Sequence, residues 1–266
     1  MKISEKERRK NKLNQDSLVQ ALRLLRECGY VILEAVLPSN WVEDMLRAYN
    51  EEVKRQFVGE KPTGHGGISA PLQMPFLDPL AIENPFAMQI LKEAMGDDIF
   101  SYFPYGSNTA WPGCGIQHIH RDTGHLFPNE PYVLPISLAV VNIALADFTD
   151  ENGATEVWPS SHLVTDLQYN DNNTLEERAT QLPSIRIIMP AGSVVVRDMR
   201  CWHRGMPNQT QEIRPMLALV YFRRFHHLPD NAQTFRNTIP PEVWEQMPPQ
   251  SQKIYSTSRR CFRSRN

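Results

Sequence analysis

Residues 184–198 read Ser-Ile-Arg-Ile-Ile-Met-Pro-Ala-Gly-Ser-Val-Val-Val-Arg-Asp, two short β-branched runs joined by a proline and a glycine. β-branched residues favour strands and the Pro-Ala-Gly sequence favours a turn, so this stretch predicts two buried strands. Runs of the same kind recur from residue 99 to residue 225. The expected strands are Ile99–Tyr105, Gln117–Asp122, Leu134–Asp147, Thr155–Val157, Ser184–Ile188, Ser193–Arg197 and Met216–Arg223. Several short strands with irregular connections predict a sandwich or barrel, such as a double-sheet jelly roll.

Helices are expected before these strands. Ser17–Cys28 carries leucines at helical spacing, and Gly29 then fits a helix C-cap. The other expected elements are a short strand at Tyr30–Leu37, a helix from Pro38 to about Phe57, a loop from Gly59 to Phe76 and a helix over Pro85–Met95. Helices first and strands after predict an α+β fold.

The length of 266 residues suits one domain with added segments. We predict a flexible tail at 1–16 and a single domain over 17–266. Within it, a helical part covers 17–98, the strand-rich core 99–225 and a C-terminal extension 226–266. The polar stretch Val164–Gln181 is expected to be a surface excursion.

Composition excludes several classes of partner. Twenty-eight basic residues against thirty acidic ones give a net charge of −2, so no overall field attracts nucleic acid or an anionic membrane. The apolar stretch Pro131–Ala146 is too short and too polar to span a bilayer.

Four widely spaced cysteines do not make a disulfide framework, and the N-terminus does not fit a secretory signal. We therefore expect a cytoplasmic protein with free thiols and a small-molecule substrate; a homodimer is left open.

The segment Gln117-His-Ile-His-Arg-Asp122 suggests a metal site. Residues two apart on a strand face the same side, so His120 and Asp122 would point together. A third ligand from elsewhere would complete a site, and imidazole with carboxylate suits iron better than zinc sites rich in thiolate. The alternative is a His–Asp ion pair on a strand.

A second segment supplies the missing groups. His203 follows the strand at 193–197, and Arg214 follows a turn-rich stretch beginning at Gly205. A hairpin would place His203 and Arg214 on adjacent antiparallel strands, with both side chains in one cavity. Two histidines and a carboxylate make the facial triad of non-haem Fe(II) oxygenases, and an arginine fork suits the distal carboxylate of 2-oxoglutarate.

These pieces together resemble the phytanoyl-CoA dioxygenase-like family of Fe(II)/2-oxoglutarate oxygenases, most closely its natural-product biosynthetic branch. The matching stretches are Gln117–Asp122, the run Asp147-Phe-Thr-Asp-Glu-Asn-Gly-Ala-Thr-Glu-Val-Trp-Pro-Ser-Ser-His162, and His203 through Asn208 to Arg214, with Glu27–Leu33 at the start. The resemblance spans roughly residues 17 to 225. It implies a double-stranded β-helix core (jelly roll, cupin-like), with the N-terminal helices packed on one sheet.

The resemblance also implies roles for individual residues. His120, Asp122 and His203 would bind Fe(II), and Arg214 would anchor 2-oxoglutarate. Gln117 and Thr155 match positions that contact this cosubstrate in the fungal biosynthetic branch. The implied reaction uses O2, releases succinate and CO2, and hydroxylates, desaturates, epoxidises or rearranges the substrate.

The sequence also bears on two other activities and on a different metal site. Halogenating relatives replace the carboxylate ligand with a small residue, so Asp122 argues against halogenation. A cupin site using His118 needs a glutamate where Gly124 and His125 stand, and His118 is expected instead to support the site or pack in the core. The main alternative is a metal-binding jelly roll without oxygenase activity, either a zinc hydrolase or a ligand-binding relative.

The substrate is expected to be a small, largely apolar metabolite rather than a fatty acyl-CoA. The sequence has no basic cluster in an obvious place to bind the phosphates of coenzyme A. The C-terminus Ser264-Arg265-Asn266 is also not a peroxisomal tripeptide. The glycine-rich segment Lys61–Phe76 is the expected lid over the pocket. Gln73, Met74 and Phe76 are its expected substrate contacts, with His65 as a further polar group. Asn142 is either a satisfied core amide or a hydrogen-bonding group in the cavity.

Overall fold

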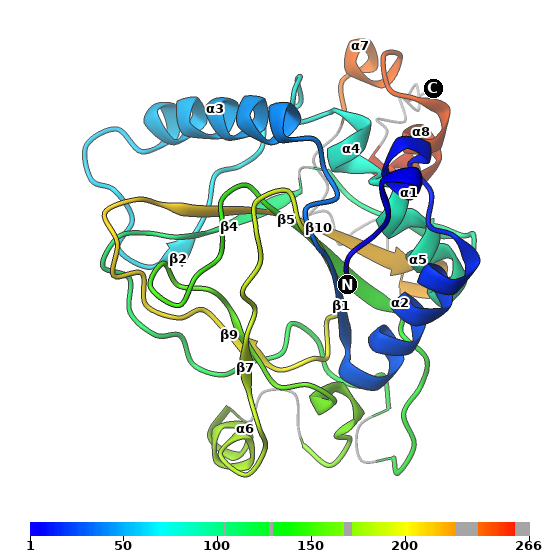
Figure 1. Cartoon of the computed structure of the whole chain (residues 1–266), viewed down its shortest axis with the longest axis vertical. Helices are drawn as coiled ribbons and strands as arrows, with labels where there is room; N and C mark the ends of the chain where they lie inside the picture. The colour runs from blue at the N-terminus through cyan, green and yellow to red at the C-terminus, as the bar shows by residue number, and fades with distance from the viewer. Residues whose placement is uncertain (104, 128–129, 168–171, 227–238, 259–266) are drawn as a thin grey trace, which may run out of the picture.

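Two antiparallel sheets form the centre of the computed structural model, which describes residues 1–103, 105–127, 130–167, 172–226 and 239–258 (Figure 1). In these residues the larger sheet has seven strands, and six of them run in the order β1-β8-β5-β10-β4-β2. Their bounds are β1 Tyr30–Leu33, β8 Val194–Asp198, β5 Leu138–Ala144, β10 Arg214–Arg223, β4 Gly106–Ala110 and β2 His65–Gly66, and β3 Ile99–Phe100 pairs with the end of β10. The smaller sheet has the order β7-β6-β9, from Ile185–Arg186, Glu156–Val157 and His203–Arg204. The fold is thus α+β, as the sequence predicts.

Side-chain alternation gives the larger sheet two different faces. On β10, Leu217, Leu219 and Tyr221 join the main hydrophobic core, whereas Met216, Ala218 and Val220 line a cavity on the other face. The neighbouring strands follow the same rule, with Val141 and Val196 in the core and Val140 and Val195 at the cavity. Successive residues of a strand point to opposite faces, so one sheet both closes the core and forms a wall of the cavity.

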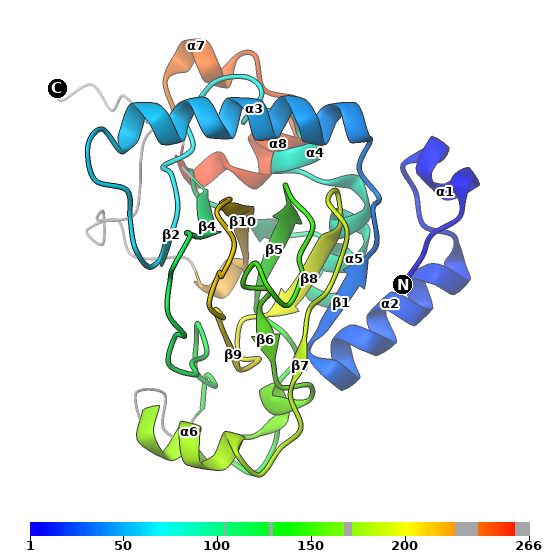
Figure 2. The same cartoon turned by 60° about the vertical axis from the view of Figure 1, so that its left-hand side comes forward.

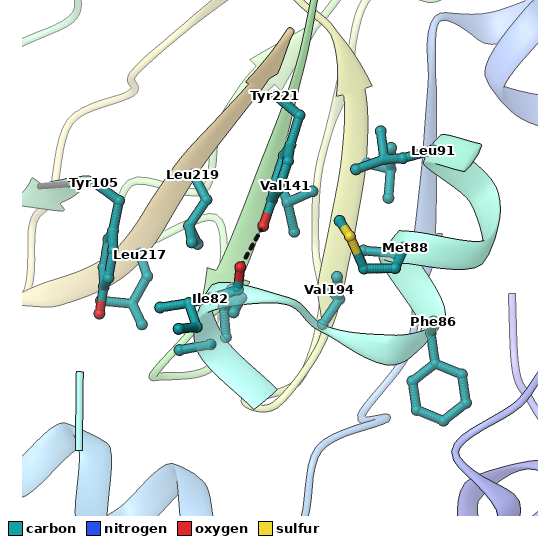
Figure 3. Packing of buried hydrophobic residues seen from close by; sticks show 14 of the residues in the cluster. Ile82, Phe86, Met88, Leu91, Tyr105, Val141, Val194, Leu217, Leu219 and Tyr221 are labelled. Atoms are coloured by element: carbon teal, nitrogen blue, oxygen red, sulfur yellow. Dashed lines mark hydrogen bonds between the residues drawn. The ribbon is translucent and has the colours of Figure 1, made fainter. Parts of the chain in front are cut away.

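Helices cover the core face of the larger sheet. Their bounds are α2 Gln15–Cys28, α3 Ser39–Gln56, α4 Pro79–Ile82 and α5 Pro85–Met95. Figure 3 shows Met88 and Leu91 of α5 near the apolar side chains of β5, β8 and β10, whereas Phe86 points away from these strands. The hydroxyl of Tyr221 donates to the carbonyl of Ile82 at 3.0 Å, which fastens α4 to β10 (Figure 3). The N-terminus of α5 is stabilised by its sequence, because the Asn84 side chain caps the helix and Pro85 occupies its first turn.

The first residues do not form the flexible tail that the sequence predicts. Helix α1 (Glu5–Lys10) has a capping box between Ser4 and Glu7, and Ile3 and Leu13 are buried in the main core. The basic composition suggested a solvated tail, yet two apolar side chains dock the segment beside α2 and α5. The amide of Leu13 also donates to Gln89 Oε1 at 3.1 Å.

Two other expectations change in the strand-rich part. The stretch Gln117–Asp122 contains no regular strand among its described residues, only a bridge from His120 to His203. The strand expected at Ile99–Tyr105 is limited to β3, and β4 follows in a polar sequence. Ser107 and Thr109 of β4 tolerate burial because both bond the hydroxyl of Tyr49.

The segments outside the sheets are also packed. Figure 2 shows α3 across one end of the strands and α6 (Asn172–Ala179) at the other. Leu175 and Ala179 of α6 are buried with Trp158 and Trp202, so the predicted surface excursion contributes to a small core. Helices α7 (Pro241–Trp244) and α8 (Pro249–Ile254) lie in the C-terminal extension, followed by Tyr255, which stacks on Phe103 with ring centroids 3.9 Å apart. Within the described residues, no helix combines the length and the apolar character that crossing a membrane requires.

Candidate active site

A histidine, an aspartate and a second histidine meet at one end of the cavity. One potential ligand atom of each of His120, Asp122 and His203 lies within 4.8 Å of the others. The backbones of His120 and His203 exchange two hydrogen bonds, of 3.0 and 2.9 Å, and the amide of Asp122 donates to Met199 O. The segment carrying the first two residues is therefore held against the strand carrying the third. All three residues of the predicted triad come together.

Backbone carbonyls orient the two imidazoles. Nδ1 of His120 lies 2.9 Å from the carbonyl of His118, and Nδ1 of His203 lies 3.2 Å from that of Cys201. A carbonyl only accepts, so each Nδ1 that donates to it carries the proton and each Nε2 keeps a free lone pair. Oδ1 of Asp122 lies 3.8 Å from Nε2 of His203. This arrangement suits two nitrogen ligands and one oxygen ligand of a single divalent metal ion.

The surroundings keep Asp122 and His203 in the forms that bind a metal. Burial raises the pKa of Asp122, but the charges of Arg197 and His203 outweigh burial and hold this pKa at about 2. Burial, together with Arg197, lowers the pKa of His203 to about 3. At neutral pH the aspartate is charged and the histidine is neutral, as metal binding requires.

The cavity has a volume of about 240 Å³ and contains most of the predicted site. Its lining includes Gln117, His120, Asp122, Asn142, Thr155, His203 and Arg214. Valine, methionine and alanine side chains from β5, β8 and β10 form its apolar wall. The site is thus a small chamber in which an apolar wall faces a comparable number of polar and charged groups.

Arg214 enters this chamber from the first position of β10. Its side chain is buried, and its guanidinium lies 4.1 Å from the centre of the Phe148 ring. Nη2 donates to Gly153 O at 2.9 Å, whereas Nε and Nη1 have no hydrogen-bond partner among the described residues. Burial lowers the pKa of Arg214 to about 10, so it stays charged at neutral pH. A buried guanidinium with two unused donors fits a carboxylate ligand, as 2-oxoglutarate would supply.

The hairpin expected between His203 and Arg214 is wrong. His203 lies on β9 of the smaller sheet, and Arg214 starts β10 in the larger sheet, between β4 and β5. The side-chain Nδ2 of Asn208 donates to Ala110 O in β4 and to Glu212 O, and these bonds hold the connection from β9 to β10 against the larger sheet. Both side chains still reach one cavity because the two sheets face it from different sides.

Gln117 and Thr155 both line the cavity. Oε1 of Gln117 accepts from the amide of Gly205 at 2.7 Å. A Cβ atom at Gly205 would lie 2.5 Å from the ring of His65 and 2.7 Å from Gln117 Oε1, so only glycine fits there. The chain after His203 can therefore pack directly on Gln117 and His65.

Asn142 and His65 line the cavity, whereas Gln73, Met74 and Phe76 do not. Nδ2 of Asn142 is buried without a partner among the described residues, so this amide can serve a ligand. Phe76 is 1 % exposed and belongs to the main core, while the exposed Met74 and its neighbour Gln73 lie outside the cavity lining. Of the segment Lys61–Phe76, only His65 lines the cavity, because β2 pairs with β4 and carries it there.

Sequence reasoning missed Arg197 and misplaced His118. Arg197 is buried on β8, where Nη2 donates to Asp122 Oδ2 at 2.8 Å. The sequence signal was a charged residue ending the run Val194-Val-Val196. His118 is instead a surface residue with a side chain 89 % exposed, paired with Glu176 at 3.1 Å. The segment is not a regular strand, so alternation does not bring His118 to the side of His120.

Comparison with known proteins identifies the family of this chain. The profile of the phytanoyl-CoA dioxygenase family (PhyH) matches residues 25–216. The chain belongs to the phytanoyl-CoA dioxygenase family. This membership confirms the predicted enzyme class, an Fe(II)/2-oxoglutarate-dependent dioxygenase, and the donor set described above fits both the metal and the cosubstrate.

Individual relatives are fungal dioxygenases. The chain is 30% identical over 253 residues to the dioxygenase aneA of Aspergillus aculeatus, covering 88% of this chain and 80% of the relative. It is 27% identical over 256 residues to the dioxygenase andF of Emericella variicolor, covering 88% and 82%. The matches extend over most of each chain, so the similarity is not confined to the metal-binding segments.

Solved structures share the fold. The epimerase SnoN in complex with Fe3+, alpha ketoglutarate and nogalamycin RO has a TM-score of 0.63 at 19% identity, covering 79% of this chain and 84% of its own. EctD from S. alaskensis in its apoform has a TM-score of 0.61 at 19% identity, covering 82% of each chain. At this identity the likeness concerns the fold.

Proposed function

We propose that this phytanoyl-CoA dioxygenase family member oxidises a small, largely apolar metabolite of a natural-product pathway, releasing succinate and CO2. The outcome would be hydroxylation, desaturation, epoxidation or rearrangement. One observation carries the proposal: a single chamber of about 240 Å³ unites the histidine–aspartate–histidine cluster with a buried arginine that has two unused donors. The names of SnoN and its ligand support a natural-product substrate, since SnoN comes from nogalamycin biosynthesis.

The metal site is assigned to His120, Asp122 and His203 as ligands of Fe(II). When bound, the iron supplies the redox chemistry that couples O2 and 2-oxoglutarate to oxidation of a substrate C–H bond. Each imidazole presents Nε2, because its Nδ1 is turned toward a backbone carbonyl. Asp122 presents Oδ1, because Arg197 holds Oδ2. Three protein ligands leave further coordination positions for small molecules.

The cosubstrate site is assigned to Arg214, Thr155 and Gln117. Nε and Nη1 of Arg214 would donate to the distal carboxylate of 2-oxoglutarate, and the Phe148 ring below the guanidinium keeps the fork in place. Oε1 of Gln117 already accepts from Gly205, so a carboxylate in the chamber would take its hydrogen bond from Nε2. The Thr155 hydroxyl would donate a further bond.

The apolar wall supports the assignment of the substrate class. Val140, Val195 and Val220 line the chamber, together with Met199 and Met216. Such side chains exclude water from the reacting groups and favour an apolar substrate. Asn142, with its unpartnered Nδ2, is the polar group that would orient the substrate. Gln73, Met74 and Phe76 would need the segment Lys61–Phe76 to rearrange before they could touch it.

The likeness to SnoN and EctD supports reading the two sheets as a double-stranded β-helix, the cupin-like jelly roll expected from the sequence. The alternative of a metal-binding jelly roll without oxygenase activity is disfavoured by the family membership. The domain limits, a homodimer and a cytoplasmic location stay predictions.

The decisive experiment is aerobic incubation of the iron-loaded protein with 2-oxoglutarate and a panel of apolar metabolites. We expect succinate release that requires Fe(II), and that rises when a panel member is oxidised. Mass spectrometry of the metabolites would identify the oxidative outcome. Succinate release that is independent of iron, or no turnover of any metabolite in the panel, would contradict the proposal.

A further inference from the structure

We infer that Arg197 is a positioning residue of the metal site, which selects the oxygen of Asp122 and the nitrogen of His203 that face the metal. The inference rests on the proposed function, because it assigns the metal to His120, Asp122 and His203. It concerns metal binding rather than turnover, so it can be tested apart from the oxygenase reaction.

The two oxygens of Asp122 have different environments. Oδ2 accepts from Arg197 Nη2 at 2.8 Å, whereas Oδ1 lies 3.8 Å from Nε2 of His203. Neighbouring ligands of one metal ion lie about 3.0–3.5 Å apart when the metal–ligand bonds are about 2.0–2.2 Å long, so Oδ1 and Nε2 need only a small approach to share a metal. A carboxylate with one oxygen held by a guanidinium offers the other oxygen alone. Arg197 therefore favours binding through Oδ1 only.

The same guanidinium approaches His203. Nη1 of Arg197 lies 3.2 Å from His203 Nδ1 and 3.4 Å from Cys201 O, and His203 Nδ1 itself lies 3.2 Å from Cys201 O. A guanidinium has no acceptor, so a bond from Nη1 to Nδ1 would require the proton of His203 on Nε2, which blocks metal binding. With a metal bound, Nδ1 must carry the proton and donate to Cys201 O. Nη1 then shares that carbonyl, and its position limits rotation of the ring.

The charge of Arg197 also matters at the site. Arg197 is 5 % exposed, and its positive charge balances the negative charge of Asp122. The arginine–aspartate pair therefore carries no net charge. A divalent metal would then keep its full charge for the dianionic cosubstrate. Replacing the arginine with a neutral side chain would remove the hydrogen bond to Oδ2, and with it the preference for binding through Oδ1.

The chain provides a matched control three residues away. Arg200 is also buried, and it pairs with Asp198 through two hydrogen bonds of 3.0 and 2.7 Å. Neither residue lines the metal chamber. Breaking this second arginine–aspartate pair should lower the stability of the fold, as breaking the first should, but it should not disturb the metal.

The experiment compares Arg197→Met, Arg197→Lys and Arg200→Met with the wild type. Metal-free protein is titrated with Co(II), whose visible absorption reports the number and kind of ligands, and each protein is melted without metal. We expect Arg197→Met to weaken Co(II) binding about 10–100-fold, the usual effect of losing a partner of a ligand, and to change the Co(II) spectrum. Arg197→Lys, which can still donate to Oδ2, should restore part of the affinity. Arg200→Met should melt earlier yet bind Co(II) with wild-type affinity and spectrum.

Two results would overturn the inference. One is wild-type or tighter Co(II) binding by Arg197→Met, and the other is equal weakening by Arg200→Met, which would indicate general destabilisation. If Arg197→Met does not fold, Arg197→Lys decides: unchanged affinity and an unchanged spectrum would contradict a positioning role. Failure of the proposed function looks different, because the wild type would bind Co(II) normally and still release no succinate from 2-oxoglutarate.

Discussion

Nε2 of His203 lies 3.8 Å from Oδ1 of Asp122, with each residue's other polar atom turned away from the space between them. Nδ1 of His203 faces the carbonyl of Cys201, and Oδ2 of Asp122 faces Arg197. Both side chains are therefore oriented before any metal arrives. This pre-organisation reduces the entropy lost when a metal binds, and it makes the contribution of each ligand measurable.

We expect His120→Ala, Asp122→Ala and His203→Ala each to abolish iron-dependent succinate formation, since each removes one of three protein ligands. Iron content after reconstitution and succinate release measure the effect. His118→Ala is the control from the same segment, because its side chain is 89 % exposed and bonds Glu176 rather than the site. Wild-type iron affinity and turnover in His120→Ala would place the metal elsewhere.

Arg214→Ala should raise the KM for 2-oxoglutarate steeply while leaving Co(II) binding nearly intact. Removing one partner of a buried charge pair costs roughly 3–5 kcal/mol, and the guanidinium here has two donors without partners among the described residues. Arg214→Lys should recover only part of the loss, because an ammonium group cannot make the two-pronged contact. An unchanged KM for 2-oxoglutarate in Arg214→Ala would refute the cosubstrate assignment.

Thr155→Val and Gln117→Ala should each weaken 2-oxoglutarate binding by about 1 kcal/mol, the contribution of one neutral hydrogen bond. Thr155→Val keeps the shape of the side chain and removes only the hydroxyl. Gln117→Ala also removes the acceptor for the Gly205 amide, so its effect should be the larger of the two. Steady-state KM values for 2-oxoglutarate test whether Gln117→Ala has the larger effect. An effect as large as that of Arg214→Ala would argue that these residues do more than contribute one neutral hydrogen bond each.

The stability of the protein should fall in weakly acidic solution, partly through His162. Burial lowers the pKa of His162 below its usual value of 6.5, although Asp198 and the Arg26 carbonyl act in the opposite direction and Arg200 adds to the lowering. A lowered folded-state pKa means that the unfolded chain takes up a proton first. The stabilisation is therefore complete above about pH 6.5 and is lost as the pH falls toward the folded-state pKa.

Melting curves of the wild type and His162→Asn between pH 7.5 and 5 test this linkage. The variant should melt earlier at pH 7.5, since it loses the contact of Nε2 with Arg26 O at 3.0 Å. The difference between the two proteins should shrink as the pH falls, because only the wild type has the buried imidazole. A constant difference would show that His162 does not contribute to the pH dependence.

Local sequence patterns predicted α2, α3, α5 and the valine-rich strands because their apolar residues repeat with the period of each element. Patterns could not predict β4, whose buried Ser107 and Thr109 depend on Tyr49 of α3, a partner distant in the sequence. The turn-rich composition after Gly205 also predicted a hairpin between β9 and β10 that does not form. Hydrogen bonds from the side chain of Asn208 hold this connection differently.

The same distinction applies to the site. His120 and Asp122 could be found from their spacing, and His203 and Arg214 from the segment after the strand at 193–197 together with the family resemblance. Arg197 has its partner Asp122 in a distant part of the chain, so the sequence showed only an arginine at the end of a buried strand. Long-range ion pairs of this kind leave no local pattern, and only the folded structure reveals them.

A comparison of His65→Ala with Met74→Ala tests which residue of the segment Lys61–Phe76 contacts the substrate. Nε2 of His65 lies 2.8 Å from Gly115 O, and the ring lies against Gly205 and Gln117 in the chamber. Burial lowers the pKa of His65, so the ring is neutral at pH 7; with the proton on Nε2, Nδ1 is an acceptor. Met74 is 63 % exposed and outside the chamber. Phe76→Ala is unsuitable, because emptying a buried aromatic site costs about 3–5 kcal/mol of stability.

We expect His65→Ala to change the substrate KM or the product distribution at least severalfold, with Co(II) binding retained. Because Met74 lies outside the chamber, Met74→Ala should leave the substrate KM and the product distribution near the wild-type values. The opposite result, an altered KM in Met74→Ala and none in His65→Ala, would show that the segment closes over the substrate during turnover and that Met74 reaches it then. Equal, wild-type behaviour of both variants would remove the segment from substrate recognition and leave Asn142 and the apolar wall of β5, β8 and β10 to select the substrate.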